Sequence, residues 1–198
     1  MKILLVGAGG TIGRSVSQAL SHHQVIAASR SGGEVRVDLS EPSSIRALFE
    51  RIGKVDAIVS AAGSLHLGPL TEMSSEQFRI GLDGKLLGQV NLALIGQHFL
   101  SDGGSITLTS GMGNEIPIRH GSNACAVNAA IEGFVRGAAV ELAAGQRINV
   151  VSPGVLQESW EALKDLFPDF EAVPAARAAR AYQRSVEGVE TGQVFKVW

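Results

Sequence analysis

The chain has a single cysteine, Cys125, so it offers no pair for an intramolecular disulfide and no cysteine cluster for a structural zinc ion. No apolar run approaches the ~20 residues that a membrane-spanning helix needs, and the run that begins at Ile3 is too short for a signal-peptide core. Lysine and arginine form no block, and the formal net charge is −2 at pH 7. We therefore predict a cytoplasmic protein with no metal site and no nucleic-acid or membrane partner.

Apolar residues are plentiful: 45% of the 198 residues are hydrophobic and only 18% are charged. This composition is sufficient for a sizeable core and argues against intrinsic disorder. No repeat, low-complexity tract or linker divides the sequence. We therefore expect one domain over residues 1–198.

Apolar runs of strand length alternate with segments of helical periodicity along the chain. The expected strands cover residues 3–6, 24–28, 34–37, 55–60, 106–109, 147–151 and 193–197. The expected helices cover residues 12–20, 42–52, 75–100, 122–144, 158–167 and 173–187. This alternation predicts an α/β fold, in which a doubly wound parallel sheet of about seven strands carries helices on both faces.

A glycine-rich loop joins the first expected strand to the first expected helix. It reads Gly7-Ala8-Gly9-Gly10-Thr11-Ile12-Gly13. Such a loop brings backbone N–H groups and the positive end of a helix close to a diphosphate, because no Cβ holds the ligand away. The loop therefore predicts nucleotide binding through Gly7, Gly9, Gly10, Thr11, Ile12 and Gly13.

The loop resembles that of the short-chain dehydrogenase/reductase family, Thr-Gly-x3-Gly-x-Gly, with Val6 at the Thr position and Thr11 at the middle Gly. Further segments are similar to family motifs, in the family's order: Asp38-Leu39, Ser60-Ala61-Ala62-Gly63, Ile148 to Gly154, and Thr191-Gly192-Gln193. The resemblance covers essentially the whole chain. It implies a Rossmann domain that binds NAD(P), with further coenzyme contacts from Asp38, Leu39, Ala61, Ala62, Gly63, Pro153, Gly154 and Val155.

The segment after the second strand indicates which dinucleotide is bound. An acidic residue there would accept a hydrogen bond from the ribose 2′-hydroxyl, whereas a basic residue pairs with a 2′-phosphate. The sequence reads Ser29-Arg30-Ser31, without Asp or Glu, and therefore favours NADP over NAD. Arg14 is a second candidate cation. The alternative is that Arg30 is a solvated loop arginine.

The family reduces carbonyls or oxidises alcohols with a Ser-Tyr-Lys-Asn set. Ser110 occupies the position of the Ser, but Ala124 stands at the Tyr position and Asn128 at the Lys position. Lys85 falls where the family has its Asn, an exchange similar to that in polyketide-synthase-type ketoreductases. The resemblance thus implies the catalytic residues Ser110, Lys85 and Asn128. The alternative for Lys85 is a surface position between helices.

The missing phenol leaves the source of the proton open. Lys85 could act directly, since partial desolvation lowers a lysine pKa, and His66 and His120 are further candidates. Cys125 is more simply explained by packing. The resulting hypotheses are an NADP-dependent oxidoreductase acting on a small carbonyl, alcohol or conjugated substrate, a catalytically silent NADP-binding sensor or partner protein, and a non-redox enzyme such as an isomerase or dehydratase.

Two further expectations concern the surface. Residues 155–170 form only a short lid, in which Trp160, Leu163 and Phe167 either cover a pocket or pack in the core. The apolar segments Gly88–Leu100 and Ser122–Ala144 correspond to the family's four-helix subunit interface, which implies a homodimer or a homotetramer.

Overall fold

The computed structural model describes all residues from Met1 to Trp198. Seven strands form one sheet in the order β3-β2-β1-β4-β5-β6-β7, and every neighbouring pair is parallel. The strands are β1 (Lys2–Val6), β2 (Gln24–Ser29), β3 (Val35–Arg36), β4 (Val55–Ser60), β5 (Leu100–Thr109), β6 (Arg147–Pro153) and β7 (Val194–Val197). The predicted doubly wound α/β fold is confirmed.

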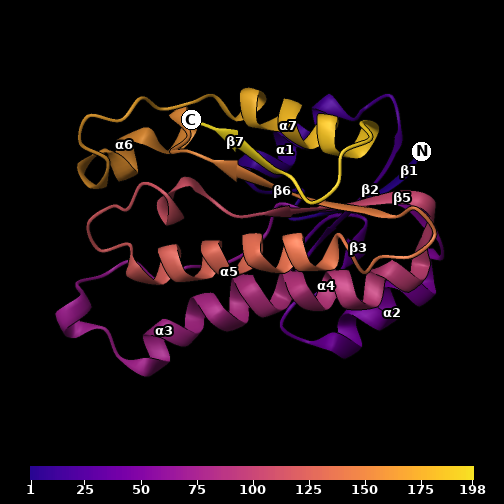
Figure 1. Cartoon of the computed structure of the whole chain (residues 1–198), viewed down its shortest axis with the longest axis horizontal. Coiled ribbons are helices and arrows are strands. Elements are labelled where there is room, and N and C mark those ends of the chain that lie inside the picture. The colour runs from indigo at the N-terminus through magenta and orange to yellow at the C-terminus, as the bar shows by residue number, and fades with distance from the viewer.

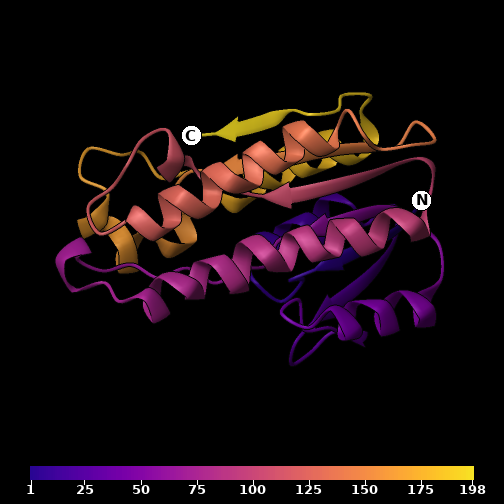
Figure 2. The same cartoon turned by 60° about the horizontal axis from the view of Figure 1, so that its bottom comes forward.

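Helices cover both faces of this sheet (Figure 1). On one face lie α1 (Thr11–Ala19) and α7 (Ala175–Glu187), and on the other lie α2 (Pro42–Ile52), α4 (Gly88–Gly96) and α5 (Ser122–Ala138). The short helices are α3 (Ser75–Gly81), which precedes α4 along the same edge of the molecule, and α6 (Trp160–Leu163) (Figure 2). No helix is both long and apolar enough to cross a membrane.

The alternation of side chains in β1 shows why its sequence is apolar throughout. Ile3 and Leu5 belong to the core beneath α1 and α7, whereas Leu4 and Val6 belong to the core beneath α2, α4 and α5. All four are buried, as is expected for a central strand of a parallel sheet. Burial on both faces fixes the position of the glycine loop that follows.

The helix expected over residues 75–100 differs from the observed one in two places. A π-helical turn occupies Leu82–Leu87 between α3 and α4, and a 3₁₀ turn, Gln97–Phe99, ends the helix. Strand β5 begins directly at Leu100, whereas the sequence predicted a strand from residue 106. The helix expected to end at Ala144 instead ends at Ala138, and the positive φ of Ala144 and Gly145 turns the chain into β6.

The carboxyl ends of all strands meet at one edge of the sheet, on the left in Figure 1. The chain leaves β1 toward β2 and leaves β4 toward β5, on opposite sides of the pair. A crevice opens where the strand order reverses in this way, and ligands of open α/β sheets bind there.

Candidate functional site

Two cavities open at this edge and share Ala62 and Gly63 in their walls. The first, which we call the glycine-loop cavity, has a volume of about 410 Å³. The second, the lysine cavity, has about 340 Å³ and a mostly apolar lining. Ten predicted coenzyme residues line the first cavity: Gly7, Gly9, Gly10, Ser29, Arg30, Ser31, Asp38, Leu39, Ala62 and Gly63. The lysine cavity adds Ile12, Ala61, Pro153, Gly154 and Val155, while Thr11 and Gly13 line neither.

The glycines of the loop serve two different purposes. A Cβ on Gly13 would lie 2.0 Å from the carbonyl oxygen of Gly7, and a Cβ on Gly7, whose φ is +85°, would lie 2.6 Å from that of Ala61. These two glycines therefore permit close packing of the loop, α1 and β4. At Gly9 a Cβ would meet no atom within 4 Å, so the open space beside it is free for a ligand.

The N-terminus of α1 is suited to an anion. Its N-cap is Gly10, which provides no side-chain cap, and its first turn contains no acidic residue. The first N–H groups of the helix are thus without a side-chain acceptor and carry the positive end of the helix dipole. This arrangement fits a dinucleotide diphosphate.

The end of β2 supplies the polar groups of the glycine-loop cavity. The Ser29 hydroxyl is held within its own loop, where it donates to the carbonyl oxygen of Gly32 at 2.5 Å and accepts from its N–H at 2.9 Å. Arg30 is exposed. Hydrogen bonds from the side chain and backbone of Ser40, with a smaller contribution from Arg30, lower the pKa of Asp38. Arg14 donates to the carbonyl oxygen of Gly9 and so lies beside the same loop.

The lysine cavity is built around the ammonium group of Lys85. Its Nζ donates to the backbone oxygen of Ser110 and to Oδ1 of Asn128, both at 2.8 Å. The three predicted catalytic residues thus meet, although they come from the π-helical turn, the end of β5 and α5. Lys85 is only 7% exposed, which excludes the alternative of a surface lysine. Its stem packs so closely on Gly63 that a Cβ there would lie 2.5 Å from Cγ of Lys85.

Burial changes the protonation equilibrium of this amine. Desolvation lowers the pKa of Lys85 to about 8, because the charged form loses its hydration inside the protein. At neutral pH the amine is mostly protonated, yet it releases its proton far more readily than an exposed lysine. Such a pKa is suited to proton transfer.

A buried carboxylate that the sequence analysis did not identify lies behind Ser110. Oε1 of Glu132 accepts a hydrogen bond of 2.9 Å from Oγ of Ser110, and Glu132 is 1% exposed. Arg136 lies 3.4 Å from its other oxygen. The sequence does contain an indication of Glu132, because Ala124, Asn128 and Glu132 are spaced four apart and therefore share one face of α5.

The end of β5 is held from both sides. Gln89 donates to the backbone oxygen of Thr109 and accepts from its N–H, each at 2.8 Å. From the other face of the sheet, the hydroxyl of Tyr182 on α7 lies 2.5 Å from Oγ1 of Thr109. Burial raises the pKa of Tyr182, which lines neither cavity. These contacts fix the position of Ser110, the next residue.

The other candidate proton donors lie outside the lysine cavity. The backbone N–H of His66 donates to Oδ1 of Asn123, and the backbone oxygen of His120 accepts from the N–H of Gly68, so hydrogen bonds hold both loops at the backbone. Cys125 donates its Sγ–H to the carbonyl oxygen of Gly113. None of His66, His120 and Cys125 lines the cavity, whereas Ala124 does.

Part of the segment 155–170 also faces the lysine cavity. Leu156, Leu163 and Phe167 are among its lining residues, and Trp160 is not. Leu156 is buried, while Leu163 and Phe167 are partly exposed. The lining of the cavity thus combines these apolar side chains with the polar group formed by Lys85 and Ser110.

Comparisons with known proteins agree with this geometry. The model of the family described as enoyl-(acyl carrier protein) reductase matches residues 11–195. The chain belongs to the short-chain dehydrogenase/reductase family, whose members bind NAD(P).

Among curated relatives, the oxidoreductase UcpA of Escherichia coli K12 is 30% identical over 131 residues, which are 62% of this chain and 50% of that protein. The chain thus spans about half the length of that relative. Among solved structures, the protein lin1944 from Listeria innocua is 47% identical with a TM-score of 0.98, and the match covers 100% of both chains. A small-chain dehydrogenase in complex with NADPH is 29% identical with a TM-score of 0.88, covering 100% of this chain and 96% of that one.

Proposed function

We propose that the chain is an NADP-dependent oxidoreductase that transfers hydride between the nicotinamide and a small carbonyl or alcohol, or a conjugated double bond. The observation that carries this proposal is the buried ammonium group of Lys85 in the wall of the lysine cavity, bonded to Ser110 and Asn128. A buried amine lowers stability, and a perturbed lysine in a cleft is a candidate for chemistry.

The choice of NADP rests on the end of β2. Arg30 and Ser31 line the glycine-loop cavity, and no carboxylate follows the strand to accept from a ribose 2′-hydroxyl. Arg14, beside Gly9, adds a second positive charge near the same loop. The NADPH complex of the small-chain dehydrogenase supports this choice. When bound, the nicotinamide supplies or accepts the hydride.

We assign the proton to Lys85, because Ala124 stands at the family's Tyr position and carries no acidic group. The amine has three N–H bonds and uses two of them on Ser110 and Asn128, which leaves one for a substrate oxygen. The hydroxyl of Ser110 donates to Glu132, so its lone pairs remain to accept from a substrate hydroxyl. Asn128 orients the amine.

This function is tested by following NADPH consumption by the purified chain with a panel of small aldehydes, ketones and enones. We expect turnover that Lys85→Met removes, while the matched surface variant Lys54→Met keeps it. Ala124→Tyr should raise carbonyl reduction if the site lacks only an efficient acid. Unchanged turnover in Lys85→Met would contradict the assignment.

Ala124 also favours a second candidate, a catalytically silent NADP-binding sensor or partner protein. The glycine-loop cavity depends little on the catalytic side chains, so coenzyme binding without turnover is physically consistent. NADPH binding without turnover of any substrate, and without gain in Ala124→Tyr, would support this reading over the first.

We also propose that residues 155–170 form the short lid of the substrate site. Leu163 and Phe167 line the lysine cavity and would contact an apolar part of the substrate. Phe167→Ala should raise KM more than it lowers kcat, because it removes a contact made equally by substrate and transition state.

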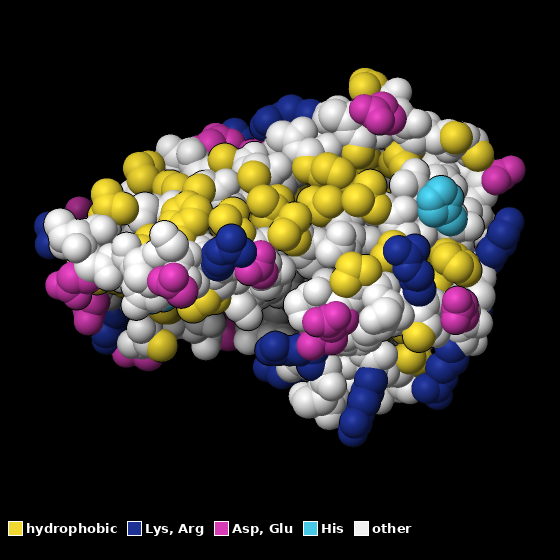
Figure 3. Space-filling view, turned by 90° about the horizontal axis from the view of Figure 1, so that it is seen from below, with side chains coloured by type: hydrophobic (Ala, Val, Ile, Leu, Met, Phe, Trp, Pro, Cys, Tyr) yellow, Lys and Arg dark blue, Asp and Glu magenta, His cyan; other side chains and the backbone are white.

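We further propose a homodimer or homotetramer that forms through α4 and α5. Figure 3 shows apolar side chains gathered over the face that these helices form. Leu94 of α4 and Leu87, which directly precedes that helix, are 49% and 47% exposed, and α5 presents the small residues Ala130 and Gly133. Sedimentation at micromolar concentration should show a dimer or tetramer, and a species that stays monomeric would contradict this assembly.

A further inference from the structure

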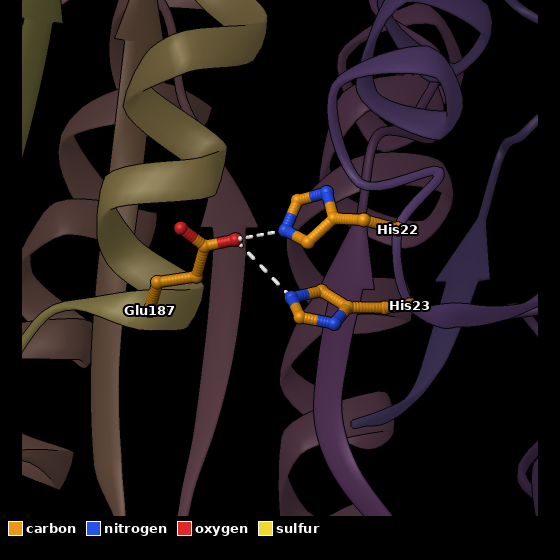
Figure 4. A group of neighbouring side chains, drawn as sticks. All are labelled: His22, His23 and Glu187. Carbon is orange, nitrogen blue, oxygen red and sulfur yellow. Dashed lines mark hydrogen bonds and ion pairs between the residues drawn. The ribbon is translucent and has the colours of Figure 1, made fainter.

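Three potential metal ligands meet at the edge of the sheet opposite the cavities (Figure 4). His22 and His23 lie in the turn between α1 and β2, and Glu187 is the last residue of α7. Oε1 of Glu187 lies 2.8 Å from Nε2 of His22 and 3.1 Å from Nε2 of His23. Both rings therefore point their Nε2 atoms at the same carboxylate oxygen, as Figure 4 shows.

We propose that His22, His23 and Glu187 form a binding site for one divalent transition-metal ion of the zinc type, which fastens the end of α7 to the turn after α1. The ligating atoms all lie within 4.8 Å of one another. Zinc bonds to imidazole nitrogen and carboxylate oxygen are about 2.0–2.2 Å long, so tetrahedral ligands lie roughly 3.3 Å apart. The observed separations from Oε1 need to lengthen by only a few tenths of an ångström.

The surroundings of the carboxylate favour a bound cation. Nε2 of Gln183 donates to both oxygens of Glu187, at 3.3 and 3.1 Å, and so fixes the orientation of the carboxylate. The oriented carboxylate thus presents Oε1 to both imidazole rings.

The exposure of the three side chains indicates an open site. The side chain of His22 is 52% exposed and that of Glu187 is 34%, whereas that of His23 is 15%. Solvent can therefore reach the ion and supply the remaining ligand. Two imidazoles favour zinc, copper or nickel over magnesium and calcium, which prefer oxygen ligands.

The position of the site suggests a structural role. The histidines precede β2, so they lie at the amino edge of the sheet, far from Lys85 at the carboxyl edge. Residues 164 positions apart in the sequence would be joined by one ion. A ligand that binds only the folded chain at a concentration 100 times its Kd favours folding about 100-fold, without changing the chemistry at the other edge.

The test uses the full chain after removal of metal with EDTA. Calorimetric titration with Zn²⁺ should give one equivalent per chain with micromolar affinity, and the unfolding midpoint should rise with Zn²⁺ but not with Mg²⁺. Substituting Co²⁺ should give the visible absorption of a tetrahedral or five-coordinate ion. His22→Ala and Glu187→Gln should each weaken binding at least tenfold, while His98→Ala, which removes an exposed histidine elsewhere, should leave it unchanged.

Circular dichroism of each variant without metal separates loss of binding from loss of folding. Two results would overturn the site: absence of stoichiometric Zn²⁺ binding, which would leave only hydrogen bonds between the histidines and Glu187, or equal binding by wild type and Glu187→Gln. Neither result bears on NADPH binding, so the two proposals succeed or fail separately.

Discussion

The two cavities at the carboxyl edge are built in different ways. The glycine-loop cavity is formed largely by backbone and by short loops, and its specific side chain, Arg30, is exposed. The lysine cavity depends on buried side chains: Lys85 from the π-helical turn, and Asn128 and Glu132 from α5, which bond to one another or to Ser110. The first therefore depends on the absence of Cβ atoms, and the second on the presence of particular functional groups. Substitutions should separate these two dependences.

The largest effect is expected at the amine of the lysine cavity. Lys85→Met should lower kcat/KM for carbonyl reduction by about 10²–10⁴-fold, the range typical of a lost general acid. The fold should persist, because methionine fills much of the same volume without a charge that must be buried. Steady-state kinetics and thermal unfolding measured on the same sample would test both parts.

The pH dependence gives an independent check on the same residue. With the pKa of Lys85 at about 8, the protonated amine needed for reduction is lost above pH 8, so the reduction rate should fall tenfold per unit there. Oxidation, which needs the neutral amine, should rise through the same range. The pKa of Lys85 is lower in the folded chain than in the unfolded chain, where it is 10.5. Burial of the charged amine therefore lowers the free energy of unfolding by its full amount below pH 8, and this loss of stability disappears as the pH rises from 8 to 10.5. Any stability gain of Lys85→Met should therefore be greatest below pH 8.

Two alanine substitutions in the glycine loop should affect different properties, one the stability of the fold and the other the affinity for NADPH. Gly13→Ala places a Cβ 2.0 Å from a backbone oxygen, and we expect it to lower the free energy of unfolding by about 1–3 kcal/mol or more. Gly9→Ala meets no neighbouring atom, so stability should be unchanged while NADPH affinity falls. Chemical denaturation and fluorescence titration distinguish the two. Equal loss of stability in both variants would contradict the division of roles.

A smaller and more selective effect is expected at Arg30. Arg30→Ala should weaken NADPH binding by about 1–3 kcal/mol, as for other charge-assisted contacts, and should leave NADH binding nearly unchanged. Fluorescence titration with both coenzymes measures the difference, with Arg46→Ala on the exposed side of α2 as the matched control. Equal losses for the two coenzymes would show that Arg30 does not read the 2′-phosphate.

The comparison of the cavities also explains what the sequence could predict. The glycine loop is contiguous, and burial of β1 on both faces fixes its place, so its residues can be recognised locally. The alternation of strands and helices is also a pattern of contiguous segments, and it predicted the sheet. The meeting of Lys85, Ser110 and Asn128 could be expected only from the family resemblance, because no periodicity links three residues on separate elements.

Three features were missed because they depend on tertiary packing. The π-helical turn Leu82–Leu87 carries Lys85, and its extra backbone residue leaves no mark in the helical periodicity of the sequence. Glu132 looks like an ordinary helix glutamate until β5 brings the hydroxyl of Ser110 to it. The pairing of Glu187 with His22 and His23 likewise requires α7 to lie beside α1.

The smallest expected effect tests whether Glu132 acts through Ser110. Glu132→Gln keeps an acceptor for the serine hydroxyl but removes the charge, so kcat for alcohol oxidation should fall about fivefold, roughly 1 kcal/mol, with NADP affinity unchanged. In a Ser110→Ala background the same substitution should have no further effect on kcat, because the hydroxyl that it positions is gone. A merely structural glutamate would instead lower stability equally in both backgrounds and leave the kcat of folded enzyme untouched. Additive losses of kcat in the double variant would show that the carboxylate acts on the substrate by another route, through the amine rather than the serine.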